Sequence, residues 1–386
     1  MTEVREPDLI DAQAMGRALL DWFDRHARDL PWRRNPDLYR TWISEMMLQQ
    51  TTVAAVVPFW ERFIARFPDV QALAAADEAE VLALWSGLGY YRRARMLHAA
   101  ARRIVGVGGG RLPADRDGWA DLPGVGEYAA GAIASIGLGE AVPALDANAR
   151  RVLVRWAAAG PETAAAWSGT RLRSLAAGLV PADRPGAWNE ALMELGATVC
   201  RARDPRCRDC PVARWCRAGR AGTAALVPAP AARTAAQSVV LSMALVRRGD
   251  ELLLLPPGCG PVPAPSAWGE PARADLGGLH RGLWGLPTTP WYRPPADDQA
   301  WQQEQLDHWR CWIGPALAVP PTCAGRVSHA ITRYRLAVTV VAMTLTGAAE
   351  PPSAGVAGAI WTRLPTHRPL SKLVRKVVAV ESHPSG

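Results

Sequence analysis

The chain has 386 residues, enough for two domains with separate cores, and a net charge of +8 from 44 Lys and Arg against 36 Asp and Glu. No apolar run approaches the length of a membrane span, and the opening MTEVREPDLI lacks the apolar core of a signal peptide. We therefore expect no membrane partner and a protein of the cytoplasm. The arginine excess favours nucleic acid as a partner, although a codon bias toward Arg would produce it too.

Two helices are predicted at the start of the chain. Apolar residues at near-helical spacing indicate an amphipathic helix from Leu9 to Ala27, and a second helix should begin near Thr41 and break or kink by Pro58. Glu45 lies on a polar stripe of the second helix. If that stripe faces water, Glu45 is an ordinary surface residue; if it faces a cleft, apolar neighbours will raise its pKa.

An aromatic and basic segment follows a short helix that Asp77 is expected to cap. The short helix should end at Trp85–Gly89, and a longer one should run on to Val105. Tyr90 and Tyr91 stand beside several arginines at the start of the longer helix. Such a mixture suits a surface that contacts bases and phosphates, and it suits a partly buried helix equally well.

The stretch from Asp121 to Asn148 joins a glycine-rich turn to two helices. The turn LPGVG precedes an alanine-rich helix at 127–136, so the backbone N–H groups of Gly124, Val125 and Gly126 stand where a phosphate oxygen could be held. A plain connection between helices is the alternative. Asp146 directly precedes the next helix, at 147–156, where it is either only a cap or also a functional carboxylate.

Four of the seven cysteines crowd into residues 200–216 with the spacing C-x6-C-x2-C-x5-C; they are Cys200, Cys207, Cys210 and Cys216. Four thiolates this close indicate a [4Fe-4S] cluster, and a zinc ion is the main alternative, although zinc sites usually pair two C-x2-C units. Residues 200–220 also hold seven Arg and two Asp, which suits contact with a phosphate backbone. The cysteines outside this segment receive no role.

The composition changes after an Ala- and Pro-rich linker at 221–236. Residues 1–220 read as an all-α domain, whereas 237–386 contain the strand-like runs SVVLSMALV, LLLL and YRLAVTVVAMTLTG, with helices expected near 297–312 and 370–380. The second domain is therefore predicted to be α+β, and the chain to be multidomain.

Several motifs occur in the order seen in adenine DNA glycosylases of the MutY type: WISEMMLQQT, LWSGLGYYRRARMLH, LPGVGEYAAGAI, LDANARRVL, NEALMELGATVC and the cysteine spacing. The resemblance covers roughly residues 10 to 380 and is strongest over the first 220. It implies an all-α helix-hairpin-helix glycosylase domain with a [4Fe-4S] loop, plus a Nudix-like C-terminal domain in which GLWGLP, at 282–287, resembles the GLWEFP turn.

The resemblance also implies a function. Such enzymes work in base excision repair and remove adenine mispaired with 8-oxoguanine or guanine from double-stranded DNA, without strong strand cleavage. It further implies a monomer that acts on the nucleoid, and a C-terminal domain that reads 8-oxoguanine and does not hydrolyse nucleotides.

Catalytic roles carry over to four residues. Cleavage of an N-glycosidic bond places positive charge on the sugar and negative charge on the departing base, so it needs an acid and an anion. By resemblance, Glu45 protonates adenine and Asp146 stabilises, or transiently bonds to, the oxocarbenium-like sugar. Tyr128 and Asn148 match the positions that assist them. Glu45 must then keep its proton while Asp146 stays ionised.

Binding roles carry over to further residues, for each of which packing or capping is the alternative. The positions that match the adenine pocket are Trp32, Arg33, Leu48, Glu190 and Met193. Gln50 and Tyr90 match residues that enter the double helix where the base is extruded. Ser328 and His329, within RVSHAI, resemble the Phe-Ser-His loop that reads 8-oxoguanine.

Of three departures from the family pattern, the one at Ala147 is small and leaves Asp146 and Asn148 in place, and the other two concern the reading of 8-oxoguanine more than catalysis. Ala147 replaces the glycine of the usual Asp-Gly-Asn, Val327 stands where the family has phenylalanine, and GLWGLPTTP lacks the usual Glu and Gly-Gly.

Two other functions stay open at this point. An endonuclease III-like glycosylase and AP lyase would place a nucleophilic lysine in the helix after the hairpin, where this chain has Tyr128. A non-catalytic iron-sulfur DNA-binding protein would have no use for both Glu45 and Asp146.

Overall fold

The computed structural model describes residues 9–34, 36–229, 235–257, 259, 262, 283–290, 292–295, 297–331, 334–346, 358–364, 366 and 370–381. The chain divides into two compact units, one of residues 1–76 with 95–232 and the other of residues 77–94 with 233–386. The domain boundaries expected from composition stay a prediction. In the part of the chain that the structure describes, no helix is both long and apolar enough to cross a membrane.

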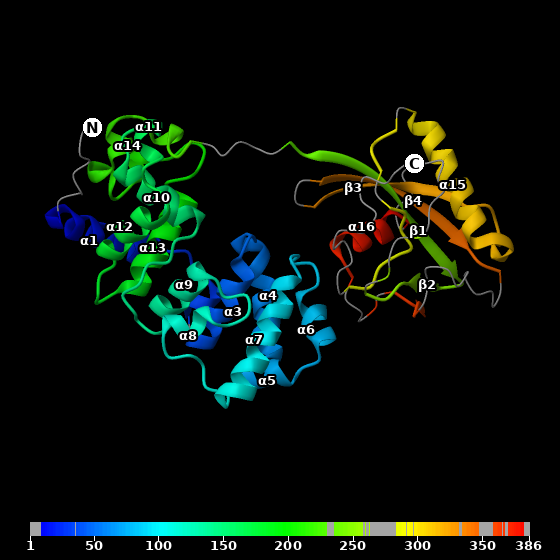
Figure 1. The fold of residues 1–386 in the computed structure, drawn as a ribbon, viewed down its shortest axis with the longest axis horizontal. Helices are drawn as coiled ribbons and strands as arrows, with labels where there is room; N and C mark the ends of the chain where they lie inside the picture. The colour runs from blue at the N-terminus through cyan, green and yellow to red at the C-terminus, as the bar shows by residue number, and fades with distance from the viewer. Residues whose placement is uncertain are drawn as a thin grey trace. The chain divides into compact units, whose positions relative to one another are not determined.

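The first unit is helical, as predicted (Figure 1). Its helices are α1 Leu9–His26, α2 Pro31–Arg34, α3 Leu38–Leu48, α4 Val53–Arg66, α5 Val70–Ala75, α7 Arg92–Gly108, α8 Arg116–Ala120, α9 Glu127–Gly137, α10 Ala147–Ala157, α11 Pro161–Ala164, α12 Gly169–Leu179, α13 Pro185–Thr198 and α14 Arg217–Arg220. The division between the two units falls within α7. Short 3₁₀ turns occur at Cys207–Asp209, Ala213–Trp215 and Ala224–Leu226.

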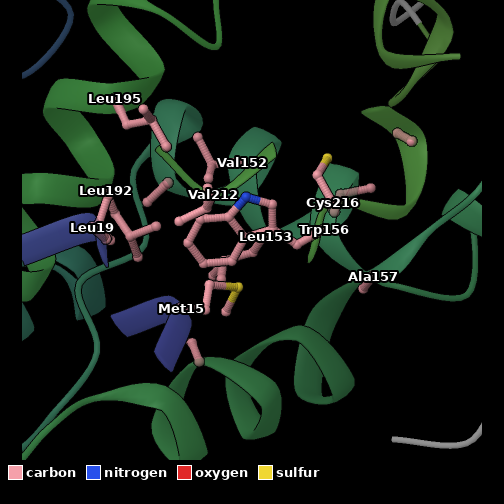
Figure 2. Close-up of a cluster of buried hydrophobic side chains, with 14 of the residues drawn as sticks. Met15, Leu19, Val152, Leu153, Trp156, Ala157, Leu192, Leu195, Val212 and Cys216 are labelled. Atoms are coloured by element: carbon pink, nitrogen blue, oxygen red, sulfur yellow. The ribbon is translucent and has the colours of Figure 1, made fainter. Parts of the chain in front are cut away.

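The apolar face of α10 forms the centre of one core of this unit. Figure 2 shows side chains of α1 and α13 packed around those of α10. The labelled members of this core are Met15, Leu19, Val152, Leu153, Trp156, Ala157, Leu192, Leu195, Val212 and Cys216. Because Cys216 belongs to the same core, the cysteine-rich segment is packed onto the helix that follows Asp146.

The helix expected to begin near Thr41 and to break or kink by Pro58 is two helices; it does break before Pro58, but the proline is not the cause. The chain leaves α3 at Gln50, which has a left-handed φ of +56°, and α4 begins after an extended Thr52. Pro58 lies inside α4. A proline near the start of a helix removes only one intrahelical N–H bond, which the apolar packing of α4 offsets.

In the described residues of the second unit, five strands form a sheet of order β3-β4-β1-β2-β5. Its elements are α6 Glu78–Trp85, β1 Gln237–Arg248, β2 Glu251–Leu254, α15 Asp298–Ile313, β3 Thr322–Ile331, β4 Tyr334–Thr344, β5 Ile360–Thr362 and α16 Lys372–Glu381. Strands β1 and β4 are parallel, and the other neighbours are antiparallel. The predicted combination of an all-α and an α+β part is confirmed.

Side-chain alternation along β1 gives the sheet two buried faces. Leu241 and Met243 pack in one core with Leu373 of α16, whereas Ala244 packs in another with Trp309 of α15. Helices α16 and α15 therefore cover opposite faces, and the strand-like runs read as nearly continuous apolar sequence for this reason.

The expected RVSHAI loop is part of a strand, and this expectation is wrong. Ser328 and His329 lie within β3, where they pair with Ala337 and Leu336 of β4. Val327 is buried and Ser328 is exposed, which is the alternation of a strand with one covered face. Of the GLWGLP motif, Gly282 lies outside the described residues, as does most of the Pro- and Gly-rich segment 256–278.

The close approach of α13 to α9 depends on Gly186. A Cβ at this position would lie 2.7 Å from the Ile136 Cα and 2.7 Å from the Ser135 carbonyl oxygen. We expect Gly186→Ala to lower the free energy of unfolding by about 1 to 3 kcal/mol, because these backbone atoms cannot move aside cheaply. Urea unfolding followed by circular dichroism measures the change.

Gly178 of α12 provides the matched control, since a Cβ there meets nothing within 4 Å. Gly178→Ala should raise the free energy of unfolding by about 0.4 to 1 kcal/mol, because alanine has fewer unfolded conformations to lose. Equal and stabilising effects of both substitutions would contradict the close-packing argument.

Candidate active site

A cavity of about 1240 Å³ lies within the first unit, and both candidate carboxylates line it. The predicted residues that share its wall are Trp32, Arg33, Glu45, Leu48, Gln50, Tyr128, Asp146, Asn148, Glu190 and Met193. They come from α2, α3, α9, α10 and α13 and from the connections that precede or follow these helices. Residues far apart in the sequence thus surround one space.

Glu45 faces this cavity from α3, so the cleft-facing interpretation of its polar stripe is confirmed. Its side chain is buried, with only 6% exposed, and its Oε2 accepts a hydrogen bond of 2.7 Å from the Tyr128 hydroxyl. Burial raises the pKa of Glu45 to about 7, and the charges of Glu190 and Asp146 act in the same direction, whereas the Tyr128 bond opposes the rise. A substantial share of Glu45 is therefore protonated at neutral pH.

Asp146 caps α10 and also lines the cavity, so the two interpretations of this residue are compatible. Its Oδ1 accepts from the Ala149 N–H at 2.6 Å, and its Oδ2 accepts from the Asn148 side-chain amide at 2.9 Å. Burial raises the pKa of Asp146, and these two hydrogen bonds oppose the rise because they stabilise the carboxylate.

Arg151 connects this cap to the cysteine-rich segment, a role that was not predicted from the sequence. Its guanidinium donates to the Asn148 Oδ1 at 2.9 Å, to the Gly196 carbonyl at 2.7 Å and to the Cys200 carbonyl at 2.9 Å. Helix α13 approaches closely here, since a Cβ on Gly196 would lie 2.6 Å from the Cβ of Asn148. The only sequence signal is an arginine one helical turn after the capping segment.

Asn189 fixes the segment that leads to Asp146 and was also missed. It is fully buried, and its amide nitrogen donates to the Ser135 hydroxyl and the Val142 carbonyl, both at 2.9 Å. Its Oδ1 accepts from the Ala144 N–H at 2.9 Å. Asn189 therefore satisfies buried backbone groups that would otherwise lack partners.

Ion pairs form another part of the cavity wall. Arg33 pairs with Glu190 at 2.7 Å and with Glu194 at 3.2 Å, and Arg28 pairs with Glu194 at 2.5 Å. Although burial opposes it, these two arginines hold the pKa of Glu194 below its usual value. Glu194 is thus an ionised anchor for the arginines, a role that neither Arg28 nor Glu194 received from the sequence.

The hairpin turn provides fewer backbone donors than the sequence suggested. Gly124 has a φ of +80°, and a Cβ there would lie 2.7 Å from the Met96 Cβ, so a glycine is required. The Val125 N–H already donates to the Leu122 carbonyl at 3.1 Å inside the turn. The backbone donors that remain for an incoming anion are the N–H groups of Gly124 and of Gly126, the N-cap residue of α9, with the first N–H groups of that helix.

The four clustered cysteines line a separate cavity of about 360 Å³. Arg155 donates to the Cys200 Sγ at 3.2 Å, and the Gly219 N–H donates to the Cys216 Sγ at 3.3 Å. Burial raises the pKa of Cys210 to about 12. Among the described residues, no three His, Cys, Asp or Glu side chains are placed to hold a single metal ion.

Arg155 is also the main support of this segment's backbone. Its buried guanidinium donates to the carbonyls of Cys200, Arg201, Ala202 and Val227.

Three predicted residues lie in the other compact unit. Tyr90 is 53% exposed with a φ of +50°. Ser328 is exposed, and its carbonyl accepts from Lys376 at 3.0 Å. Burial, together with the charges of Lys376 and Lys372, lowers the pKa of His329.

Comparison with known proteins agrees with this geometry. Residues 43–169 match the HhH-GPD superfamily of base excision DNA repair proteins. The chain is 35% identical to the adenine DNA glycosylase of Rattus norvegicus over 98% of this chain and 80% of that protein. It is 46% identical to the adenine DNA glycosylase of Mycolicibacterium smegmatis over 54% of this chain and 71% of that protein.

Among solved structures, a thermostable thymine-DNA glycosylase has 27% identity and a TM-score of 0.51, covering 55% of this chain and 97% of that one. Because the identity to the Rattus norvegicus protein extends over most of both chains and includes the segments that form the cavity, this chain belongs to the adenine DNA glycosylase family.

Proposed function

We propose that this DNA N-glycosylase, a hydrolase of base excision repair, removes adenine mispaired with 8-oxoguanine or guanine in double-stranded DNA. The observation that carries the proposal is that Glu45 and Asp146 line one cavity in different hydrogen-bonding environments. At about 1240 Å³ the cavity has room for an extruded nucleoside.

The two carboxyl groups divide the chemistry. Glu45, with a pKa of about 7, donates its proton to the adenine ring as the bond between base and sugar breaks. Asp146 remains an anion because the Ala149 N–H and the Asn148 amide stabilise its charge, and it stabilises the positive sugar. Water then adds to the sugar carbon, and its released proton returns to the Glu45 carboxylate. Adenine and an abasic site are the products.

The cavity favours hydrolysis over lyase chemistry. Tyr128 occupies the position where a lyase would have its lysine, and its hydroxyl is engaged with Glu45. No lysine is found among the described residues that line the cavity. Schiff-base formation requires an amine at this place, so we propose a monofunctional glycosylase.

A [4Fe-4S] cluster held by Cys200, Cys207, Cys210 and Cys216 is the cofactor that we propose. Zinc, with Zn–S bonds of about 2.3 Å, draws its sulfurs together around one ion. Here the spacing C-x6-C-x2-C-x5-C lacks the two C-x2-C units of a typical zinc site, the four thiols line one cavity, and N–H groups donate to two of the sulfurs, which suits the thiolate ligands of a cluster. The cluster would cross-link the arginine-rich segment.

Duplex DNA would be held by backbone and basic groups. The first turn of α9 and the arginines of residues 200–220 are suited to phosphates. Gln50 and Tyr90, both with positive φ, would enter the double helix where adenine leaves it. Ser328 and His329 on β3 would read 8-oxoguanine.

Neutralising Asp146 tests the mechanism. Asp146→Asn keeps an oxygen that can accept from the Ala149 N–H but loses the charge that stabilises the sugar. We expect single-turnover adenine release from an A:8-oxoguanine duplex to fall by about 10² to 10⁴, while the duplex remains bound. Asp69→Asn is the matched control, because Asp69 caps α5 in the same way and lies outside the cavity wall.

A fully active Asp146→Asn variant would contradict the role assigned to this residue. The same duplex tests the proposed absence of lyase activity, since stoichiometric trapping of a protein–DNA adduct with borohydride requires a Schiff base. Offering A:8-oxoguanine, A:G and A:T duplexes side by side tests the substrate.

The pH dependence should report the state of Glu45. Because the protonated form is the active one, adenine release should fall as the pH rises through about 7. Tyr128→Phe removes a hydrogen bond that stabilises the carboxylate, so the decline should move to higher pH. Single-turnover rates across the pH range measure both curves, and an unmoved decline in Tyr128→Phe would count against Glu45 as the titrating acid.

Metal analysis tests the cofactor. Purified protein should contain about four irons and four acid-labile sulfides per chain and absorb near about 400 nm. Cys207→Ser should lose most of this absorbance because a ligand is missing, whereas Cys311→Ser, at an exposed cysteine on α15, should retain it. Zinc at one equivalent without iron would refute the cluster.

A further inference from the structure

The loop between α6 and α7 holds an exposed aromatic residue in an unfavourable conformation. Gly87 and Gly89 have φ values of +108° and +82°, and Tyr90 follows with +50°. A bulky residue rarely adopts positive φ, so the surrounding structure must hold Tyr90 there. The residue is nevertheless 53% exposed, which leaves it available to a partner.

Contacts of Trp85 and Arg93 with Gly89 and Tyr90 stabilise this conformation of the loop. Both the Trp85 indole and the Arg93 guanidinium donate to the Gly89 carbonyl, at 3.0 and 3.3 Å. The Arg93 guanidinium also lies 5.4 Å from the ring centres of Trp85 and Tyr90. Arg93 is only 8% exposed, so the Tyr90 ring packs against a buried guanidinium.

A second set of contacts ties the same loop to the far end of the chain. The Ser86 hydroxyl donates to the Leu370 carbonyl at 2.8 Å and accepts from Arg375 of α16 at 2.6 Å. The Tyr91 hydroxyl donates to the Leu370 carbonyl at 3.3 Å and accepts from the Gly87 N–H at 3.1 Å.

These contacts flank the strained positions on both sides. Ser86 and Leu370 are buried, so water does not replace the bonds if they break. Ser86 precedes the first left-handed glycine, and Tyr91 follows Tyr90 directly. Residues 77–94 accordingly belong to the same compact unit as β3 and α16, although the chain places them among the helices of the first unit.

We propose that Ser86, Tyr91 and Arg375 are positioning residues that hold Tyr90 in the conformation that enters DNA. The C-terminal unit thereby carries both the strand that would read 8-oxoguanine and the support of the residue that helps to extrude adenine. Lesion reading and base extrusion are then performed by one compact body. This inference rests on the role proposed for Tyr90.

The test uses the full chain and a duplex with 2-aminopurine beside the A:8-oxoguanine pair, where its fluorescence rises as stacking is lost. Tyr91→Phe and Ser86→Ala remove only hydroxyl groups, and Arg375→Met removes the charged donor. Each should slow the fluorescence rise and single-turnover adenine release by about threefold to tenfold, in keeping with the loss of one or two hydrogen bonds. Arg310→Met, at an exposed arginine on α15, should change neither rate.

A Tyr90→Ala background separates positioning from general destabilisation. If the three residues act through Tyr90, adding Tyr91→Phe or Arg375→Met to Tyr90→Ala should reduce the rates no further. An equal further loss in that background would overturn the inference, as would wild-type rates in all three single variants.

The experiment distinguishes failure of the extruding role of Tyr90 from failure of the positioning role of the other residues. If Tyr90→Ala itself leaves the fluorescence rise unchanged, the extruding role of Tyr90 is wrong, and the positioning role fails with it. If Tyr90→Ala abolishes the rise while the three supporting variants retain it, only the positioning role is wrong.

Discussion

The hydrogen bond from the Ala149 N–H to Asp146 fixes where α10 begins, and much of the first unit depends on it. It turns one carboxylate oxygen toward the helix and leaves the group at the cavity wall. The next turn of the helix provides Asn148 and Arg151, which link the cap to the Cys200 carbonyl. The apolar side of α10 packs in the core. The start of α10 therefore fixes the Asp146 carboxyl, the cysteine-rich segment and the apolar core relative to one another.

Glu45 has fewer donors than Asp146 to oppose the effect of burial. Burial raises the pKa of both carboxyl groups, but Asp146 accepts from the Ala149 N–H and the Asn148 amide, whereas Glu45 accepts from the Tyr128 hydroxyl and its pKa is raised to about 7. The ion pairs of Arg28 and Arg33 with Glu190 and Glu194 are formed in the same wall, so the arginine charge is largely matched. Each of the two carboxyl groups in the cavity wall therefore has its own set of hydrogen-bond partners.

Local signals carried most of what could be predicted from the sequence. Most of the expected long helices end within about three residues of their observed ends, because caps, glycines and apolar spacing are encoded nearby; the helix expected to continue from Thr41 past Leu48 is the exception. The direction in which Glu45 faces could not be decided, since a polar stripe does not say whether water or Tyr128 lies opposite it. Arg151 and Asn189 were missed because their partners lie up to about fifty residues away. The β3 strand was hidden because its pairing with β4, and not its composition, makes RVSHAI extended.

The contact between Gly196 and Asn148 has a genetic consequence. No side chain larger than hydrogen fits at residue 196 unless the backbone beside Asn148 moves, so every missense change of this codon shifts the start of α10. Such an allele would encode every residue of the cavity wall unchanged and still displace Asn148, which lies in that wall. Variants that impair this protein are therefore expected at positions where helices pack closely as well as in the lining of the cavity.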